Sequence, residues 1–261
     1  MITKYEGALF DIELSDTYQF NLLKQSLYNP IKKLIGPFLG KPYRKDEVLK
    51  YIFSSEIQNP VVIDIGCHVG TVALPIAKRF PNASIICVDA NPAPLAKFIR
   101  NINLNQSKKI HIVNAAISDE KSLLTIYPCS GNAGGARVTG FKGRPEEDEG
   151  GGVLVPSISI EEIFSFYKIS KCDFLKIDVE GYELSALRSA GGLLRPSTIK
   201  AVIAEYGPEG CRSAGITGWD IVEYMLTRGY KCKDLTDNKD IVSQKDIPLI
   251  KDYCVTNFLF T

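Results

Sequence analysis

The sequence predicts an α/β fold with a doubly wound, mostly parallel seven-stranded sheet, ending in an antiparallel terminal hairpin and preceded by an N-terminal extension. Apolar strand-like segments alternate with segments of helical periodicity along the 261-residue chain. Several of the strand-like segments end in an acidic residue, and the first of them opens into a pair of glycines. Hydrophobic residues make up 45% of the chain, which is enough to bury the core of one such domain.

The expected elements follow from runs of apolar and β-branched residues and from apolar residues spaced three or four apart. Strands are expected at residues 61–65, 84–89, 110–114, 174–177 and 200–205. Helices are expected near residues 69–79, 93–103, 160–167, 183–189 and 221–228. The segments 230–235 and 256–260 are expected to pair as the terminal hairpin.

We expect residues 1–55 to form an N-terminal extension or cap, and residues 56–261 to form the α/β domain. A helix is expected at 46–54. The segment before it contains Pro30, Pro37 and two lysines, which suit a membrane-bound helix poorly. A cap over a binding site, a dimerisation arm and a membrane-surface contact stay open, and an extension packed on the domain is favoured.

Residues 131–152 are rich in glycine and include an acidic run at 146–149. This composition predicts a loop. Such a loop is either a substrate lid beside a site or a solvated surface segment.

The strand at 61–65 leads into the first motif, an Asp-x-Gly-x-x-x-Gly turn made by Asp64, Gly66 and Gly70. Glycine lets the backbone turn sharply and lets a ligand approach closely. A dinucleotide fingerprint would need glycines where His68 and Thr71 stand, and the chain has no Walker-type motif. A carboxylate at the end of the strand favours a cationic ligand, such as the ammonium and sulfonium groups of S-adenosylmethionine.

The second motif is the acid Asp89, which closes the strand at 84–89 about 20 residues after the glycine turn. An acidic side chain in this place can accept hydrogen bonds from both hydroxyls of a ribose. Ala90 and Asn91 then lead into a helix that begins near Pro92. The spacing therefore supports a site for a nucleoside-containing cofactor.

The strongest motif is Lys-Ile-Asp-Val-Glu-Gly-Tyr-Glu at residues 176–183. Its acids follow a buried strand at the carboxyl edge of the sheet, where ligands bind in open α/β folds. Glu205 ends the next expected strand. Clustered carboxylates of this kind could supply a general base, hold a hard metal ion or cap the following helices, and for Glu183 the cap is favoured.

These motifs, together with Asn-Ala-Ala at 114–116, resemble those of the FkbM-type methyltransferases over roughly residues 60–210. The segment 155–163 is also similar to the family's segment before the acidic motif. Three departures are His68, where the family often has Asn, Asp89, where it often has Glu, and Ser-Ile-Glu at 159–161 in place of Thr-Leu-Asp.

The resemblance implies a Rossmann-like class I methyltransferase fold and S-adenosylmethionine-dependent methylation, most often of an oxygen on a sugar or another small metabolite. The cofactor-binding residues that it suggests are Asp64, Gly66, His68, Gly70, Asp89, Ala90, Asn91, Ala115, Ala116 and Asp178. Among them Asp64, Gly66 and Gly70 would lie at the methionine end, Asp89 at the ribose, Ala115 and Ala116 near the adenine, and Asp178 near the reacting methyl. The catalytic candidates are Asp178, Glu180 and Glu205. A divalent metal is possible for such a set, but no metal site is predicted.

Composition limits the partners. The chain has 31 basic and 30 acidic residues and a formal net charge of +1, so no nucleic-acid partner is expected. Its seven cysteines are scattered without a C-x-x-C motif, which is typical of reduced thiols in the cytoplasm. No apolar run reaches the length of a transmembrane segment. Assembly of the chain into a homo-oligomer is possible.

Three classes of function stay open. The first is methylation of a hydroxyl on a small molecule or glycan, and the second is methylation of nitrogen, protein or nucleic acid. The third is a non-catalytic module that only binds S-adenosylmethionine. The intact acids Asp64 and Asp89 count against loss of cofactor binding, and the absence of an Asn/Asp-Pro-Pro-Tyr/Phe motif counts against the common N-methyltransferase type.

Overall fold

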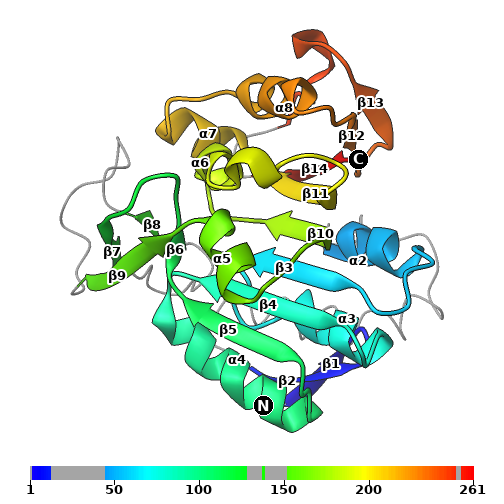
Figure 1. Cartoon of the computed structure of the whole chain (residues 1–261), viewed down its shortest axis with the longest axis vertical. Coiled ribbons are helices and arrows are strands. Elements are labelled where there is room, and N and C mark those ends of the chain that lie inside the picture. The colour runs from blue at the N-terminus through cyan, green and yellow to red at the C-terminus, as the bar shows by residue number, and fades with distance from the viewer. Residues whose placement is uncertain (1, 13–44, 128–136, 139–151, 251–253) are drawn as a thin grey trace.

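A computed structural model describes residues 2–12, 45–127, 137–138, 152–250 and 254–261. Its main feature is an eight-stranded sheet with the strand order β13-β12-β14-β11-β10-β3-β4-β5 (Figure 1). The strands are β3 (Val61–Ile65), β4 (Ser84–Asp89), β5 (Ile110–Asn114), β10 (Cys172–Ile177), β11 (Ile199–Tyr206), β12 (Cys232–Asp234), β13 (Lys239–Ile241) and β14 (Thr256–Phe260). All five strands expected in the parallel part are present, and three of them have the expected bounds.

The sheet is mixed, and the prediction of seven strands is wrong by one. Strands β11, β10, β3, β4 and β5 are parallel, whereas β14 runs antiparallel to both β11 and β12. The additional strand is β13, which pairs antiparallel with β12 at the edge.

The predicted terminal hairpin is correct in its pairing and wrong in its connection. Strands β12 and β14 are antiparallel neighbours, but β12 first forms a hairpin with β13. The reason lies in the turn after β12, where the Asp234 carboxylate accepts the Thr236 backbone N–H at 2.8 Å and Asn238 has a φ of 53°. Side chains of this type reverse the chain locally, so the hairpin closes before β14 is reached.

Helices cover both faces of the sheet, as expected for a doubly wound fold. One face packs against α5 (Ile160–Phe166), α6 (Glu183–Arg188) and α8 (Gly218–Thr227), with Ile63, Leu175 and Val202 among its buried strand residues. The other face packs against α2 (Lys45–Phe53), α3 (Ala73–Arg79) and α4 (Pro92–Asn105), with Val62, Phe174 and Ile203. Successive strand residues thus alternate between two cores.

A separate four-stranded sheet lies at the end of the molecule toward which β3 and β10 point (Figure 1). It has the strand order β6-β9-β7-β8, with β6 (Ala116–Ile117), β9 (Val153–Ile158), β7 (Leu123–Tyr127) and β8 (Arg137–Val138). This sheet was not predicted from the sequence. Strand β8 falls within the expected loop at 131–152, most of which lies outside the described residues.

The described part of the N-terminal extension packs on the α/β domain. Strands β1 (Ile2–Tyr5) and β2 (Ala8–Asp11) form a hairpin whose turn has positive φ at Glu6 and Gly7. Two asparagines of α4 hold β2: Asn101 Oδ1 accepts the Asp11 backbone N–H at 2.8 Å, and Asn105 Oδ1 accepts that of Leu9 at 2.7 Å. The cap, arm and membrane alternatives for residues 1–55 stay untested, because residues 13–44 lie outside the described residues.

The helix predicted at 46–54 is present as α2, and its Val48, Leu49 and Ile52 are buried in the same core as β1 and β2. The boundary between residues 55 and 56 stays a prediction. Within the described ranges, the longest helices fall short of the length and apolar character that a membrane span requires.

Candidate active site

The glycine turn after β3 is held against β4 and α4. Gly66, His68 and Gly70 all have positive φ, at 77°, 50° and 88°. The Gly66 N–H donates to the Val88 carbonyl at 2.8 Å, which ties the turn to β4. A Cβ atom at position 70 would overlap with the ring of Phe98 on α4. The need for glycine at position 70 therefore comes from packing within the chain, in addition to any ligand.

Asp89 joins the end of β4 to the glycine turn. Its Oδ2 accepts the backbone N–H of His68 at 2.8 Å, and its Oδ1 accepts that of Asn91 at 2.8 Å. Burial raises the pKa of Asp89 to about 6, and the two backbone hydrogen bonds oppose this shift. Each carboxylate oxygen has a further lone pair, so a fixed Asp89 can still accept hydrogen bonds from a ligand.

The corner between β4 and β5 is organised around the backbone of the predicted ribose-binding residues. The Asn114 side-chain amide donates to the carbonyls of Asp89 at 2.9 Å and Ala90 at 3.0 Å, and the Ala115 N–H donates to the Asp89 carbonyl. Asn91 begins α4, and its side chain accepts the Ala93 N–H. The Asn114 side chain thus holds the β4 corner in place.

Ala115 and Ala116, the predicted adenine-side residues, are both buried. Ala116 belongs to β6, in the small sheet, and packs with Ile126 and Val155. Ala90 is partly buried against the same cluster. The structure therefore brings these three alanines together beside Asp89.

A buried lysine lies between two aspartates of the site, Asp64 before the glycine turn and Asp178 after β10. Lys176, on β10, lies 2.9 Å from Asp178 Oδ2 through its Nζ atom, and the same Nζ lies 3.9 Å from Asp64 Oδ1. The exposed fractions of the side chains are 4% for Lys176, 1% for Asp64 and 12% for Asp178. Sequence reasoning missed Lys176, although a single lysine within an apolar strand is the kind of residue that is rarely buried without a charged partner.

The turn that follows Asp178 is held by Glu183. Glu180 and Gly181 have φ values of 53° and 105°, and the Glu183 carboxylate accepts the backbone N–H groups of Val179 and Gly181 at 3.0–3.2 Å. Burial raises the pKa of Glu183 to about 7. Glu183 was expected to cap a helix, and its carboxylate does satisfy the N–H groups just before α6.

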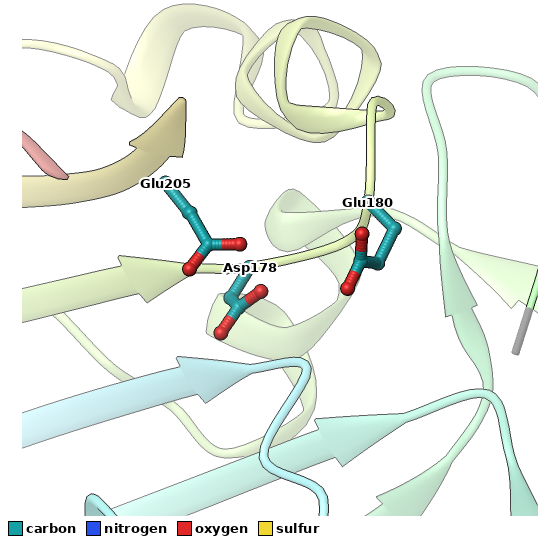
Figure 2. A group of neighbouring side chains, drawn as sticks. All are labelled: Asp178, Glu180 and Glu205. Carbon is teal, nitrogen blue, oxygen red and sulfur yellow. The ribbon is translucent and has the colours of Figure 1, made fainter. Parts of the chain in front are cut away.

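The turn after Asp178 also places the Glu180 carboxylate at the edge of the sheet. Asp178, Glu180 and Glu205 each place a carboxylate oxygen within 4.8 Å of one another, and all three residues are half-buried. Figure 2 shows Glu205 at the end of β11, Asp178 just beyond β10 and Glu180 on the loop that follows, with their carboxylates gathered in one space. We call these three residues the acidic cluster. Such a group can share a proton or orient a polar ligand, and its geometry alone assigns no metal.

The site thus collects the carboxyl ends of β3, β4, β10 and β11. Four predicted residues lie together there, namely Asp64, His68, Asp89 and Asp178. They meet because the glycine turn contacts both β4 and Asp178, the residue after β10. Which of these residues bind a cofactor or take part in chemistry stays a prediction.

Comparison with known proteins gives curated sequence relatives and matches among solved structures. The curated 2-O-methyltransferase NoeI of Sinorhizobium fredii (strain NBRC 101917 / NGR234) is 23% identical over 202 residues, covering 72% of this chain and 81% of that protein. Methyltransferase sdnD of Sordaria araneosa is 21% identical over 210 residues, with 71% and 80% covered. Among solved structures, precorrin-6y C5,15-methyltransferase from Geobacter metallireducens GS-15 matches with a TM-score of 0.46 and 11% identity, over 83% of this chain and 86% of that chain.

The sequence model of the methyltransferase FkbM domain matches residues 64–232. The matched segment begins at Asp64, contains the glycine turn, Asp89 and the acidic cluster, and ends in β12. It covers more than half of the chain. The protein therefore belongs to the FkbM methyltransferase family.

Proposed function

We propose that this protein transfers the methyl group of S-adenosylmethionine to a hydroxyl of a sugar or another small metabolite. The observation that carries the proposal is the acidic cluster at the end of β10 and β11, directly beside the glycine turn of β3. The relative NoeI, named a 2-O-methyltransferase, supports oxygen as the acceptor atom.

The residues of the site suit this cofactor. Asp64 is buried at the end of β3, and with Asp178 it offers negative charge to a cationic methionine end. Asp89 is fixed by two backbone N–H groups and can accept from ribose hydroxyls, while Ala115 and Ala116 form a small buried surface nearby. When bound, S-adenosylmethionine supplies a methyl group that is already activated by a positively charged sulfur.

The chain's own contribution is then alignment of the acceptor and removal of its proton. Three carboxylates within 4.8 Å can accept hydrogen bonds from a polyhydroxylated acceptor, and one of them can take the hydroxyl proton. We assign this role first to Asp178, with Glu180 and Glu205 as its neighbours. An uncharged, hydroxyl-rich acceptor fits such a site better than an anionic one, because a negative acceptor would be repelled.

We also propose a reducing, cytoplasmic setting. Cys67, Cys87, Cys172, Cys211, Cys232 and Cys254 are all free thiols, and five of them are buried. Burial raises the pKa of Cys172 and Cys211 to about 12, so these thiols are poorly reactive.

Calorimetry and a labelling assay test the proposal. Purified protein is titrated with S-adenosylmethionine, S-adenosylhomocysteine and NAD, and micromolar binding of the first two without NAD binding is expected. Protein is then incubated with methyl-labelled S-adenosylmethionine and a panel of glycans, nucleosides, peptides and cell metabolites. Label found on a hydroxyl supports the proposal, whereas label on nitrogen, protein or nucleic acid would replace it. Cofactor binding without transfer to any acceptor would favour a non-catalytic module.

A further inference from the structure

Lys176 is buried at a place where the sheet brings two aspartates together. It is the register partner of Asp64 on the neighbouring parallel strand, and Asp178 follows it by two residues on the same face. In the next strands outward the register partners are Ile203 and Cys87, which are fully buried. A charged group in this row has little access to water, so its charge must be balanced by its neighbours.

The ionisable groups around the two aspartates are largely acids. Cys67 and Cys87 interact electrostatically with Asp64, and Asp89 interacts with both Asp64 and Asp178. Glu183 interacts with Asp178, and Glu180 and Glu205 complete the acidic cluster around it. Close carboxylates oppose one another's ionisation, and the effect grows with burial. Lys176 works in the opposite direction, at 2.9 Å from one aspartate and 3.9 Å from the other.

We propose that Lys176 is a positioning residue of the cofactor site, a built-in counter-ion that keeps Asp64 and Asp178 both ionised before the cofactor arrives. The inference rests on the proposed function, in that the ligand drawn to these carboxylates is cationic S-adenosylmethionine. Without the lysine, one of the two aspartates retains a proton in the empty site. A cationic ligand then expels that proton to the solvent on binding. With the lysine, both carboxylates are already ionised, so binding of the cofactor releases no proton from them.

The test compares Lys176→Met with wild type, because methionine keeps a side chain of similar length without charge. The matched control is Lys200→Met, on the adjacent strand β11, where the lysine is exposed. S-adenosylmethionine is titrated in two buffers of different ionisation enthalpy at one pH, and the difference in heat gives the protons released. Asp89 and Glu183 interact with Asp178 and can also exchange protons, so the comparison is made above pH 7, where Asp89 is ionised, and is repeated in a Glu183→Gln background.

Lys176→Met is expected to release about one proton more per cofactor bound than wild type, and Lys200→Met none more. The double variant Lys176→Met/Asp178→Asn keeps Asp64 as the one carboxylate of the aspartate pair, so its proton release should return to the wild-type value. Without cofactor, Lys176→Met should melt about 10 °C below wild type, since one partner of a buried ion pair is gone, and the double variant should recover much of this loss.

A folded Lys176→Met protein with wild-type proton release would overturn the inference. If Lys176→Met does not fold, the double variant decides: recovery of folding supports charge balance, and failure shows that the lysine serves only the packing of β10. If neither wild type nor Lys200→Met binds S-adenosylmethionine, the proposed function fails. The melting comparison still tests the charge balance in that case, so the two failures are distinguishable.

Discussion

The α-carbon of Gly66 faces the backbone carbonyl of Asp178 so closely that a Cβ atom at position 66 would overlap with that oxygen. The Asp178 N–H in turn donates to the Ile65 carbonyl at 3.0 Å. The glycine turn and the acidic motif, far apart in the sequence, are therefore one structural unit. Any change that pushes the turn away from β10 should disturb both ends of the site together.

Gly66→Ala is expected to destabilise the protein by about 2–4 kcal/mol, because the new methyl group meets backbone and the φ of 77° is unfavourable for alanine. Urea denaturation measures the loss. The control is Gly192→Ala, since a Cβ there meets no atom within 4 Å. Equal stability of the Gly66 variant and wild type would contradict the close contact.

Asp89→Ala is expected to weaken S-adenosylmethionine binding by roughly 1–3 kcal/mol, through the loss of charge-assisted hydrogen bonds to the ribose. The pKa of about 6 adds a pH dependence: wild-type affinity should fall as the pH drops below 6, where the carboxylate becomes protonated. Asp89→Asn should lack this fall. Calorimetry between pH 5 and 8 tests both, and the exposed Asp237→Ala serves as a control.

Asp178→Asn is expected to lower turnover by about 10²-fold or more, the usual effect of removing a positioned acid or base, while the protein stays folded. Rates are measured with the acceptor that the labelling screen identifies, and cofactor affinity is measured alongside. If Asp178→Asn keeps full turnover and Glu205→Gln abolishes it, the base is Glu205, at the end of β11.

Glu183 should make the stability of the protein depend on pH. Its pKa is about 7 in the folded chain and 4.5 in an unfolded one, so the folded state binds more protons between these values. The free energy of unfolding should therefore decrease as the pH rises from 4.5 to 7, by about 3 kcal/mol from this residue.

Glu183→Gln carries no titratable group at this position, so the difference between its stability and that of wild type should change across the same pH range. Urea denaturation at pH 5 and pH 8 measures that difference. The exposed Glu120→Gln provides the control, because this side chain lies at the surface, whereas that of Glu183 is buried. A difference that stays constant with pH would show that Glu183 does not titrate in this range.

The parallel strands could be predicted closely because each is a largely apolar run that ends at or just before a polar or glycine residue. Residues 61–65 and 84–89 are strands with those bounds. Strand β13 could not be found this way, since Lys239-Asp240-Ile241 contains one apolar residue and pairs through its backbone. In β9, Pro156 weakened the strand pattern, because proline lacks the N–H that a strand interior uses.

The motifs also predicted which acids would share one edge of the sheet, because the carboxyl ends of parallel strands meet there. They did not predict the contacts between those acids and the rest of the chain. The role of Lys176 depends on its register with Asp64, which only the pairing of β10 with β3 reveals. The hydrogen bonds of Asn114 to Asp89 and Ala90 likewise depend on how β5 lies beside β4.

The position of β14 has a consequence for the order of events during biosynthesis. It lies between β11 and β12, so β12 and β13 join the sheet only through a strand that is translated after both of them. Until residue 260 leaves the ribosome, β11, which carries Glu205, has an open edge that β14 will later cover. A nascent chain stalled before this point would hold most of the site and still expose backbone that can pair with another polypeptide.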